Sequence, residues 1–367
     1  MKKFSSYIIF FALLLSVHIS AQTTSFILLG DTHYDKMENH DFQWLSANNA
    51  GDLSQIEGYT ANTRTNWDDF MKHLTNVVKT NPTPIKALLQ MGDISEGLAG
   101  DSKADQMAKS VMEAIDKSGI GVPWIIAKGN HDVTSGDAAK LAFMNNYIPM
   151  IRKQTGNNSI NSANYSYKVG NIEFFVCDYY ERSSVDPILW LDAAAKASTA
   201  TYKFAIFHQP VIPVTERCWH MYNTPADDAN RQRLLQVMAT NKLIALVGHL
   251  HRYSVVRRTT QWGPIVQIMT TSVMSNRNDV STSSIITAYG PSIAANLPTY
   301  EPTTLEARKA MLAAEQPFVT YYKQCTLHGY GILSIDEATS KIELKYYGGF
   351  SCVPFDTVDI SALMINQ

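Results

Sequence analysis

Five of the ten histidines in this 367-residue chain lie in short polar clusters that also contain carboxylates and one asparagine. In chain order the clusters are DTH, GDIS, GNHD, FHQP and GHLH. Imidazole and carboxylate groups together suit Zn, Fe, Mn or Co, and mixed nitrogen and oxygen ligands are typical of hydrolytic metal centres. A single Gly-Asp pair is usually a turn, but all five clusters together favour a metal site. The candidate ligands are Asp31, His33, Asp93, Asn130, His208, His249 and His251.

Each polar cluster follows an apolar, β-rich run, as in SFILLGDTH and KLIALVGHLH. Such runs are typical of buried strands, and segments with helical spacing lie between them. Alternating strands and helices predict an α/β sheet whose faces are covered. Ligands bind such sheets at the carboxyl ends of strands, so we expect the clusters to converge on one edge. The predicted helices are residues 67–79, 103–117, 136–147, 187–196 and 227–240.

Local spacing supports this arrangement of ligands. In DTH and HLH the outer residues are two apart, so an extended strand end would direct both side chains to the same side. A glycine precedes four of the clusters, where the chain must turn sharply or let a ligand approach its backbone. These glycines are Gly30, Gly92, Gly129 and Gly248.

The pattern changes after His251, where QWGPIVQIMTTSVMS and GYGILSIDEATSKIELKYYGG indicate strands joined by turns. We interpret these strands as a second, more antiparallel sheet. Residues 36–65 and 276–304 are rich in small and polar residues and predict long irregular loops. Because long loops in compact proteins are usually functional or disordered, we expect both on the substrate side. No linker divides the chain, so residues 22–367 are predicted to form a single domain.

The N-terminus, MKKFSSYIIFFALLLSVHISAQ, has two lysines, an apolar run and small residues before Gln22. This layout predicts a secretory signal peptide of residues 1–21 and a periplasmic or secreted protein. The apolar run of about a dozen residues is shorter than the ~20 needed to cross a bilayer. No later stretch is long and apolar enough, so we expect no membrane span in the mature chain.

The formal charge bears on possible partners, and the cysteine content bears on possible disulfides. Loss of Lys2 and Lys3 with the leader takes the formal charge from −2 to −4, and the chain has no long basic block. We therefore expect no stable nucleic-acid partner. An oxidising compartment would allow one or two disulfides, and the alternative is four separate core residues, which we favour for the first of them. The cysteines are Cys177, Cys218, Cys325 and Cys352.

The five clusters resemble the signature blocks of the calcineurin-like metallophosphoesterase family, over the stretch from Asp31 to His251. The resemblance implies a four-layer α/β/β/α sandwich of two mixed β-sheets flanked by helices. It also implies two divalent metal ions, drawn from Mn, Zn, Fe and Co, with Asp93 bridging them. One ion would take Asp31, His33, Asp93 and His251. The other would take Asp93, Asn130, His208 and His249.

Phosphate esters resist hydrolysis because the nucleophile and the phosphoryl oxygens are both negative. Two cations about 3.5–4 Å apart would lower the pKa of a bridging water and neutralise the charge of an in-line displacement. We assign His131 to protonating the leaving alkoxide or stabilising the phosphoryl oxygens, and Asp132 to orienting its imidazole. The candidate contacts to a small-molecule substrate are Tyr34, Arg252 and His220.

The first cluster distinguishes branches of the resembled family. Purple acid phosphatases carry a glycine at the position of His33 and a ligating tyrosine shortly after Gly-Asp, and GDISEG lacks that tyrosine. The Asp-x-His form looks more like cyclic-nucleotide phosphodiesterases, nucleotidases and general phosphodiesterases. We therefore predict a hydrolase of small phosphate esters, with diesters favoured over monoesters. The alternative is an inactive protein whose metal-containing groove binds a phosphorylated ligand. The oligomeric state stays open.

Overall fold

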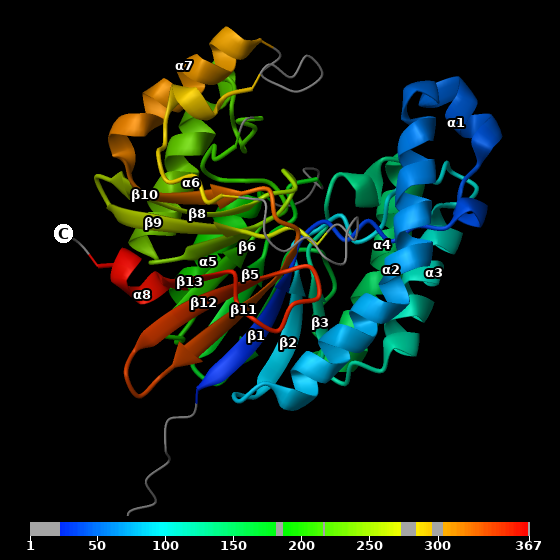
Figure 1. The fold of residues 1–367 in the computed structure, drawn as a ribbon, viewed down its shortest axis with the longest axis horizontal. Helices are drawn as coiled ribbons and strands as arrows, with labels where there is room; N and C mark the ends of the chain where they lie inside the picture. Colours follow the sequence, from blue (N-terminus) through cyan, green and yellow to red (C-terminus); the bar gives the residue numbers. More distant parts are fainter. Residues whose placement is uncertain (1–22, 181–185, 216, 273–283, 296–303, 366–367) are drawn as a thin grey trace, which may run out of the picture.

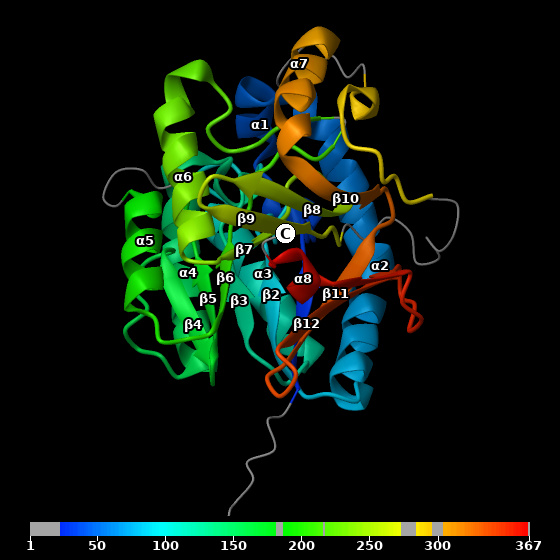
Figure 2. The same ribbon diagram turned by 90° about the vertical axis from the view of Figure 1, so that its left-hand side faces the viewer.

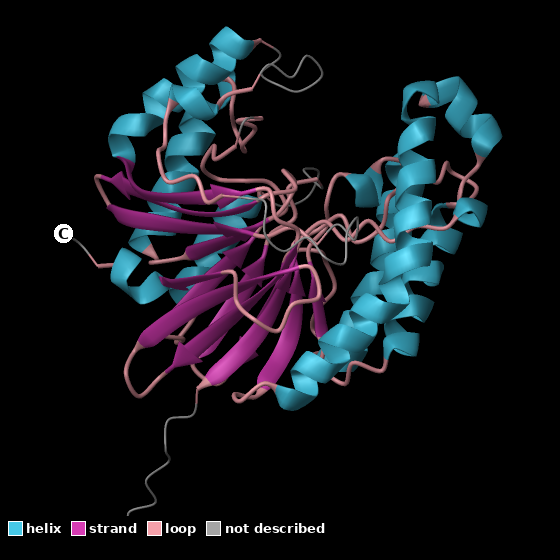
Figure 3. Cartoon of the chain, in the orientation of Figure 1, coloured by secondary structure: helices cyan, strands magenta, loops and turns pink. Residues whose placement is uncertain are grey.

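The computed structural model describes residues 23–180, 186–215, 217–272, 284–295 and 304–365. Its strands form two mixed sheets, one of six strands and one of seven, and helices lie outside them (Figures 1 and 3). The predicted four-layer sandwich of two mixed sheets is therefore confirmed. No helix in the described part of the chain has the length and apolar character needed to cross a membrane. The predicted signal peptide lies outside the described residues.

The first sheet carries the first three polar clusters. Its order is β13-β12-β11-β1-β2-β3, and β1, β2 and β3 run parallel, whereas β11 to β13 are antiparallel. Because the three parallel strands end on the same edge, the loops that follow them meet there. The strands are β1 (Thr24–Leu29), β2 (Ile85–Gln90), β3 (Trp124–Ile126), β11 (Gly329–Asp336), β12 (Lys341–Gly348) and β13 (Asp356–Asp359).

The second sheet carries the last two clusters. Its order is β10-β8-β9-β7-β6-β5-β4, with β5, β6, β7 and β9 parallel to one another. The antiparallel strands β8 and β10 extend one end of this sheet, and β4 extends the other. The strands are β4 (Tyr165–Val169), β5 (Ile172–Val176), β6 (Tyr202–Ile206), β7 (Ile244–Val247), β8 (Tyr253–Thr260), β9 (Gly263–Met269) and β10 (Val319–Cys325).

The strands that follow His251 do not form a sheet of their own, and that prediction is wrong. Strand β9 pairs with β7, while β11 pairs with β1 and extends the first sheet with β12 and β13. Strands β1 and β7 would otherwise leave a row of unpaired backbone donors and acceptors at a sheet edge. The later strands satisfy these groups, so both sheets become mixed.

The core between the sheets holds them face to face. All six residues of β1 are buried, as expected for a strand covered on both faces. Aromatic pairs join the sheets, with the ring centroids of Phe26 and Phe174 4.6 Å apart and those of Tyr253 and Tyr346 4.0 Å apart. Burial of these large rings contributes strongly to the hydrophobic stabilisation of the sandwich.

Helices cover the outer faces. Helices α2, α3 and α4 lie beside the first sheet, whereas α5 and α6 lie beside the second (Figures 1 and 2). The five predicted helices all exist, and α3, α5 and α6 agree with prediction to within one residue at each end, whereas α2 and α4 are longer. The helices are α1 (Phe42–Asn48), α2 (Leu53–Thr80), α3 (Ala104–Ser118), α4 (Gly136–Thr155), α5 (Pro187–Ala197), α6 (Asp228–Thr240), α7 (Leu305–Glu315) and α8 (Ile360–Leu363).

The irregular loop predicted for residues 36–65 is wrong, because most of this segment is helical. It contains two short 3-10 helices, Met37–Asn39 and Ala50–Asp52, together with α1 and the first part of α2. Its one fully buried position within α2, Ile56, packs in a small apolar cluster. Most of residues 276–304, the other predicted loop, lies outside the described residues.

The cysteine alternatives are resolved in favour of separate residues. No disulfide joins Cys177, Cys218, Cys325 and Cys352, all four of which are described. The first three are buried and Cys352 is exposed. Burial raises the pKa of the Cys177 thiol well above its usual value, with the charge of Asp178 adding to the effect, so this thiol stays protonated at neutral pH.

Candidate metal centre

The seven predicted ligands occupy loops that follow β1, β2, β3, β6 and β7, and these loops converge between the helical layers (Figure 3). Five of the seven have a left-handed backbone, which is unfavourable for residues with a Cβ and is often found where function requires it. The extended strand end predicted for DTH and HLH is therefore wrong. The φ values are 50° for Asp31, 45° for His33, 52° for Asp93, 75° for His249 and 52° for His251.

One group of donor atoms forms around His33. Its Nε2 lies 3.0 Å from Nε2 of His251, and the latter lies 3.7 Å from Oδ1 of Asp31. The donor atoms of these three residues lie within 4.8 Å of one another. Oδ2 of Asp93 is 3.8 Å from Nε2 of His33. The four residues assigned to the first ion therefore face a common point.

A second group forms around His208. Its Nε2 lies 3.1 Å from Oδ2 of Asp93 and 3.0 Å from Oδ1 of Asn130. Nδ1 of His249 is 3.1 Å from Nε2 of His208 and 2.8 Å from Oδ1 of Asn130. The same Asp93 oxygen thus lies near both groups, as a bridging ligand must.

The donor atoms fit a cation better than they fit one another. Oδ2 of Asp31 is buried and has no hydrogen-bond partner among the described residues, which is costly for a carboxylate oxygen. His33 and His208 each donate through Nδ1, to Oε2 of Glu96 at 2.7 Å and to the Met91 carbonyl at 2.8 Å. These bonds fix the ring tautomers and leave each Nε2 available to a metal.

Two glycines let the ligand loops approach one another closely. A Cβ on Gly129 would lie 2.1 Å from Oδ1 of Asp93, and a Cβ on Gly92 would lie 2.5 Å from Nδ1 of His208. Gly92 also has a φ of 88°, which a residue with a Cβ rarely adopts. Of the two predicted reasons for glycine before these clusters, close approach is confirmed at both positions and a sharp turn at Gly92.

Electrostatics divide the histidines into two kinds. Burial opposes the charged form of His33, but the hydrogen bond and charge of Glu96 outweigh it and raise the pKa of His33 to about 9. Asp93 similarly outweighs burial and raises the pKa of His208 to about 9. Burial, followed by the charges of His208 and His33 respectively, holds the pKa of His249 and His251 well below the usual value. Cation binding at His33 and His208 therefore competes with protons.

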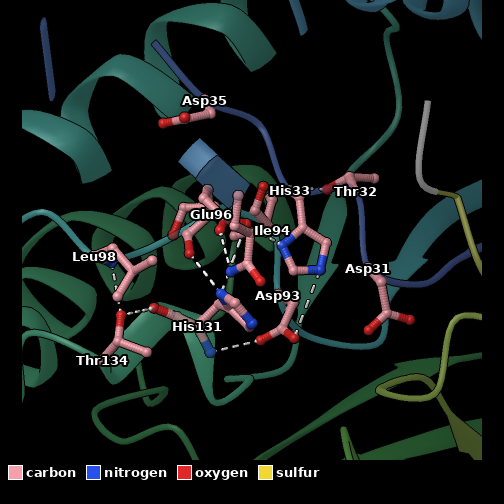
Figure 4. Close-up of polar contacts among 12 residues, drawn as sticks. Asp31, Thr32, His33, Asp35, Asp93, Ile94, Glu96, Leu98, His131 and Thr134 are labelled. Carbon is pink, nitrogen blue, oxygen red and sulfur yellow. Dashed lines mark hydrogen bonds and ion pairs between the residues drawn. The ribbon is translucent and has the colours of Figure 1, made fainter. Parts of the chain in front are cut away.

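His131 lies next to the centre, and Glu96 fixes the orientation of its ring. Its Nδ1 donates to the Glu96 carbonyl oxygen at 2.6 Å, and its backbone N–H donates to Oδ1 of Asp93 at 2.8 Å (Figure 4). Donor atoms of His33, Glu96 and His131 also cluster within 4.8 Å. Because Nδ1 of both rings already bonds to Glu96, this third group serves to position the rings.

Asp132 does not orient the His131 imidazole, so the role predicted for it is wrong. Its buried carboxylate accepts backbone N–H groups from Asp93 at 3.0 Å, Ser95 at 3.1 Å and Gly129 at 2.9 Å. These bonds tie the loops after β2 and β3 together. Asp132 thereby places Asp93, and Glu96 takes the orienting role.

The match to a family of known proteins agrees with this geometry. The family model for calcineurin-like phosphoesterases matches residues 24–253, which contain all seven candidate ligands. The chain belongs to this family. No curated protein matches the sequence.

Two solved structures are similar in fold to this calcineurin-like phosphoesterase. The purple acid phosphatase PPD1 from yellow lupin (Lupinus luteus) seeds has a TM-score of 0.52 and 12% identity, over 94% of this chain and 56% of the lupin chain. The structure of PhoD has a TM-score of 0.50 and 10% identity, over 92% of this chain and 68% of that one. The chain thus spans little more than half of the lupin protein, and at these identities the likeness concerns the fold.

The three residues predicted to contact the substrate of this phosphoesterase lie in different surroundings. Tyr34 is buried and packs edge-on against Trp67 with ring centroids 4.7 Å apart, in a cavity lined by none of the candidate ligands. His220 is buried, and burial followed by the charge of Arg231 lowers its pKa to about 3. Contact of Tyr34 and His220 with the substrate therefore stays a prediction. Arg252 donates to the carbonyl oxygen of the candidate ligand His251 at 2.9 Å and therefore lies beside the centre.

Sequence reasoning missed two residues of α2 that contact the site. The ring of Tyr59 stacks on His33, with centroids 4.4 Å apart and planes 16° apart. One turn earlier, Gln55 donates to Oε1 of Glu96 at 2.6 Å. Burial, followed by the charges of Glu96 and Asp31, raises the pKa of Tyr59. The spacing of four residues between Gln55 and Tyr59 would have indicated one helical face, had the segment been recognised as a helix.

A buried ion pair supports the loop that carries Asn130. The ammonium of Lys128 donates to Oδ2 of Asp178 at 2.7 Å, and both side chains are almost fully buried. Replacing Lys128 with methionine should lower the free energy of unfolding by about 3–5 kcal/mol, because the Asp178 carboxylate would stay buried without its partner. Urea unfolding followed by circular dichroism measures this change.

The double variant Lys128→Met/Asp178→Asn provides the control for that experiment. Oδ1 of Asp178 accepts the Tyr180 N–H at 2.9 Å, and an asparagine oxygen keeps that bond without a charge. The double variant should therefore regain part of the lost stability. A single variant as stable as the wild type would show that the pair contributes nothing.

Proposed function

We propose that this phosphoesterase is a dinuclear metal-dependent hydrolase of small phosphate esters. The observation that carries the proposal is the pair of donor groups that share one oxygen of Asp93, at 3.1 Å from His208 and 3.8 Å from His33. Family membership supports phosphate-ester hydrolysis as the reaction class. The two groups supply four protein ligands each, which suits two ions of Mn, Zn, Fe or Co.

The side chains around the centre would have separate roles in the reaction. Two divalent ions, when bound, supply an activated water and neutralise negative charge on the phosphoryl group. His131 is held by Glu96 through Nδ1, which leaves its Nε2 to give a proton to the leaving alkoxide. Asp132 holds the backbone of Asp93 in place and takes no part in proton transfer. His33 and His208 would each have to be deprotonated at Nε2 to hold a cation, so their protons would compete with metal.

We favour a diester over a monoester as the substrate because the first cluster has the Asp-x-His form. His33 contributes Nε2 to the first donor group, in the position where a purple acid phosphatase would have glycine. The N-terminal sequence supports export to the periplasm or the medium after removal of residues 1–21. Residues 22–367 then form the working enzyme under this proposal.

Removal of metal from the purified residues 22–367 tests the function. The protein should hydrolyse bis(4-nitrophenyl) phosphate, lose that activity after treatment with a chelator, and regain it with Mn²⁺ or Zn²⁺. The same assay with 4-nitrophenyl phosphate ranks diesters against monoesters. The metal content of each sample, measured by mass spectrometry, should return with the activity.

Two results would contradict the proposal in different ways. Metal-loaded protein that turns over neither ester would favour the alternative of an inactive protein that binds a phosphorylated ligand. Full activity with one metal ion per chain would instead point to a mononuclear hydrolase. A heat-denatured sample at the same metal concentration controls for hydrolysis by free ions.

A further inference from the structure

The loop after β6 reaches back to the second donor group through a strained turn. Cys218 is buried and has a φ of 56°, in the left-handed region that residues with a Cβ rarely occupy. Its backbone N–H and its thiol both donate to the Thr215 carbonyl oxygen, at 3.0 and 3.1 Å. The buried anchor holds the unfavourable conformation in place.

The two residues that flank Cys218 both reach the ligand His249. Nη1 of Arg217 lies 3.5 Å from the His249 carbonyl oxygen. The ring of Trp219 meets the His249 ring edge to face, with centroids 4.9 Å apart and planes 63° apart. The strained turn therefore directs a cation and an aromatic wall at the same ligand, and both side chains are only partly buried.

The contact with His249 places Arg217 beside the second donor group. Nδ1 of His249 lies 3.1 Å from Nε2 of His208 and 2.8 Å from Oδ1 of Asn130, and Nη1 of Arg217 lies within hydrogen-bond distance of the His249 carbonyl oxygen. A partly exposed guanidinium at this position lies near the place where a substrate must sit.

We propose that Arg217 binds a non-bridging oxygen of the substrate's phosphoryl group. This inference deepens the proposed function and rests on it. A guanidinium presents two parallel N–H donors that match two oxygens of a phosphate, and it stays charged at all relevant pH values. It would oppose the negative charge that grows on the phosphoryl oxygens during displacement. The ligands recognised in this way are inorganic phosphate, phosphomonoesters and phosphodiesters.

The test compares two variants. Arg217→Met keeps the apolar part of the side chain, whereas Arg217→Lys keeps the positive charge but loses the paired N–H donors of the guanidinium. Calorimetric titration of the Mn²⁺-loaded protein with inorganic phosphate should show at least about 10-fold weaker binding by Arg217→Met. The kcat/KM for bis(4-nitrophenyl) phosphate should fall by about 10²–10³-fold. Arg217→Lys should recover part of both losses, because an ammonium binds phosphate as a point charge.

Arg233→Ala is the matched control, since it also removes one arginine charge. Arg233 lies on α6 and forms an exposed ion pair with Asp186, the residue that precedes α5. The phosphate affinity of Arg233→Ala should stay within about twofold of the wild type. Metal content and circular dichroism establish that each variant is folded and loaded, and Arg217→Gln replaces Arg217→Met if the latter does not fold.

The outcomes separate this inference from the proposed function. Unchanged phosphate affinity in folded, metal-loaded Arg217→Met or Arg217→Gln would overturn the inference, whatever the activity. If the wild type hydrolyses no ester but binds phosphate through Arg217, the proposed hydrolase fails and the phosphate site stands. Equal losses in Arg217→Met and Arg233→Ala would attribute the effect to net charge and would also overturn the inference.

Discussion

Replacing Asp93 with asparagine should lower kcat/KM for a phosphodiester by at least about 10³-fold, since loss of one donor that stabilises a transition state alone costs about 10²–10³. One oxygen of Asp93 lies near His33 and His208, while the other accepts the His131 N–H at 2.8 Å. An asparagine keeps one acceptor oxygen but has no charge, so it cannot hold two cations together. Metal analysis should show that the variant retains no more than one of the two ions that we propose for the wild type.

Asp137→Asn is the matched control for this experiment. Asp137 lies in the first turn of α4, with its side chain 99% exposed, and pairs with Lys140 at 3.3 Å. The same change of charge there should alter neither metal content nor activity. An Asp93→Asn protein that retains both ions and full activity would exclude the bridging role.

Replacing His131 with alanine should lower kcat by about 10²–10⁴-fold while leaving both metal ions bound, as expected for loss of a general acid. The ring is bonded to Glu96 through Nδ1 and belongs to neither donor group around Asp93. The diester assay measures kcat, and mass spectrometry measures the metal content. Esters with better leaving groups should lose less, because they need less help from a proton donor.

His73→Ala serves as the control, since His73 lies on α2 and bonds to Tyr330 at 3.1 Å, among residues of the first sheet. It should keep wild-type kcat. If His131→Ala lost metal together with activity, His131 would be a ligand, and the role of proton donor would have to be abandoned. A uniform loss across all leaving groups would instead favour stabilisation of the phosphoryl oxygens.

The convergence of the candidate ligands could be predicted from sequence because each lies in a short motif directly after a strand. Because the parallel strands end at the same edge, Asp31 lies beside His251 and Asp93 lies beside His208, although each pair is far apart in the chain. The roles of nearby residues depend on backbone direction instead. The left-handed turn at His33 sends Tyr34 toward Trp67 and away from the ligands, which sequence proximity cannot reveal.

The helical character of residues 36–65 was missed for a physical reason. The N-terminal part of α2 buries Ile56 but otherwise presents mainly polar residues, so its apolar periodicity becomes clear only from Trp67 onward. The polar face contacts the candidate site, because Gln55 bonds to Glu96 and Tyr59 stacks on His33. Asp132 was misassigned because adjacency to His131 suggested a side-chain bond, whereas its carboxylate serves three backbone amides.

Strand β1 lies between β2 and the C-terminal strand β11, with Thr24 opposite Ile335. A ribosome must therefore synthesise more than 300 further residues, from Thr24 to Ile335, before the strand that precedes Asp31 acquires its second neighbour. Contacts of such large sequence separation slow folding. While β11 is absent, the partly folded chain exposes an unpaired strand edge, which promotes aggregation. Shortened expression fragments that stop after His251 would retain the seven candidate metal ligands, but they would leave the first sheet with an open edge.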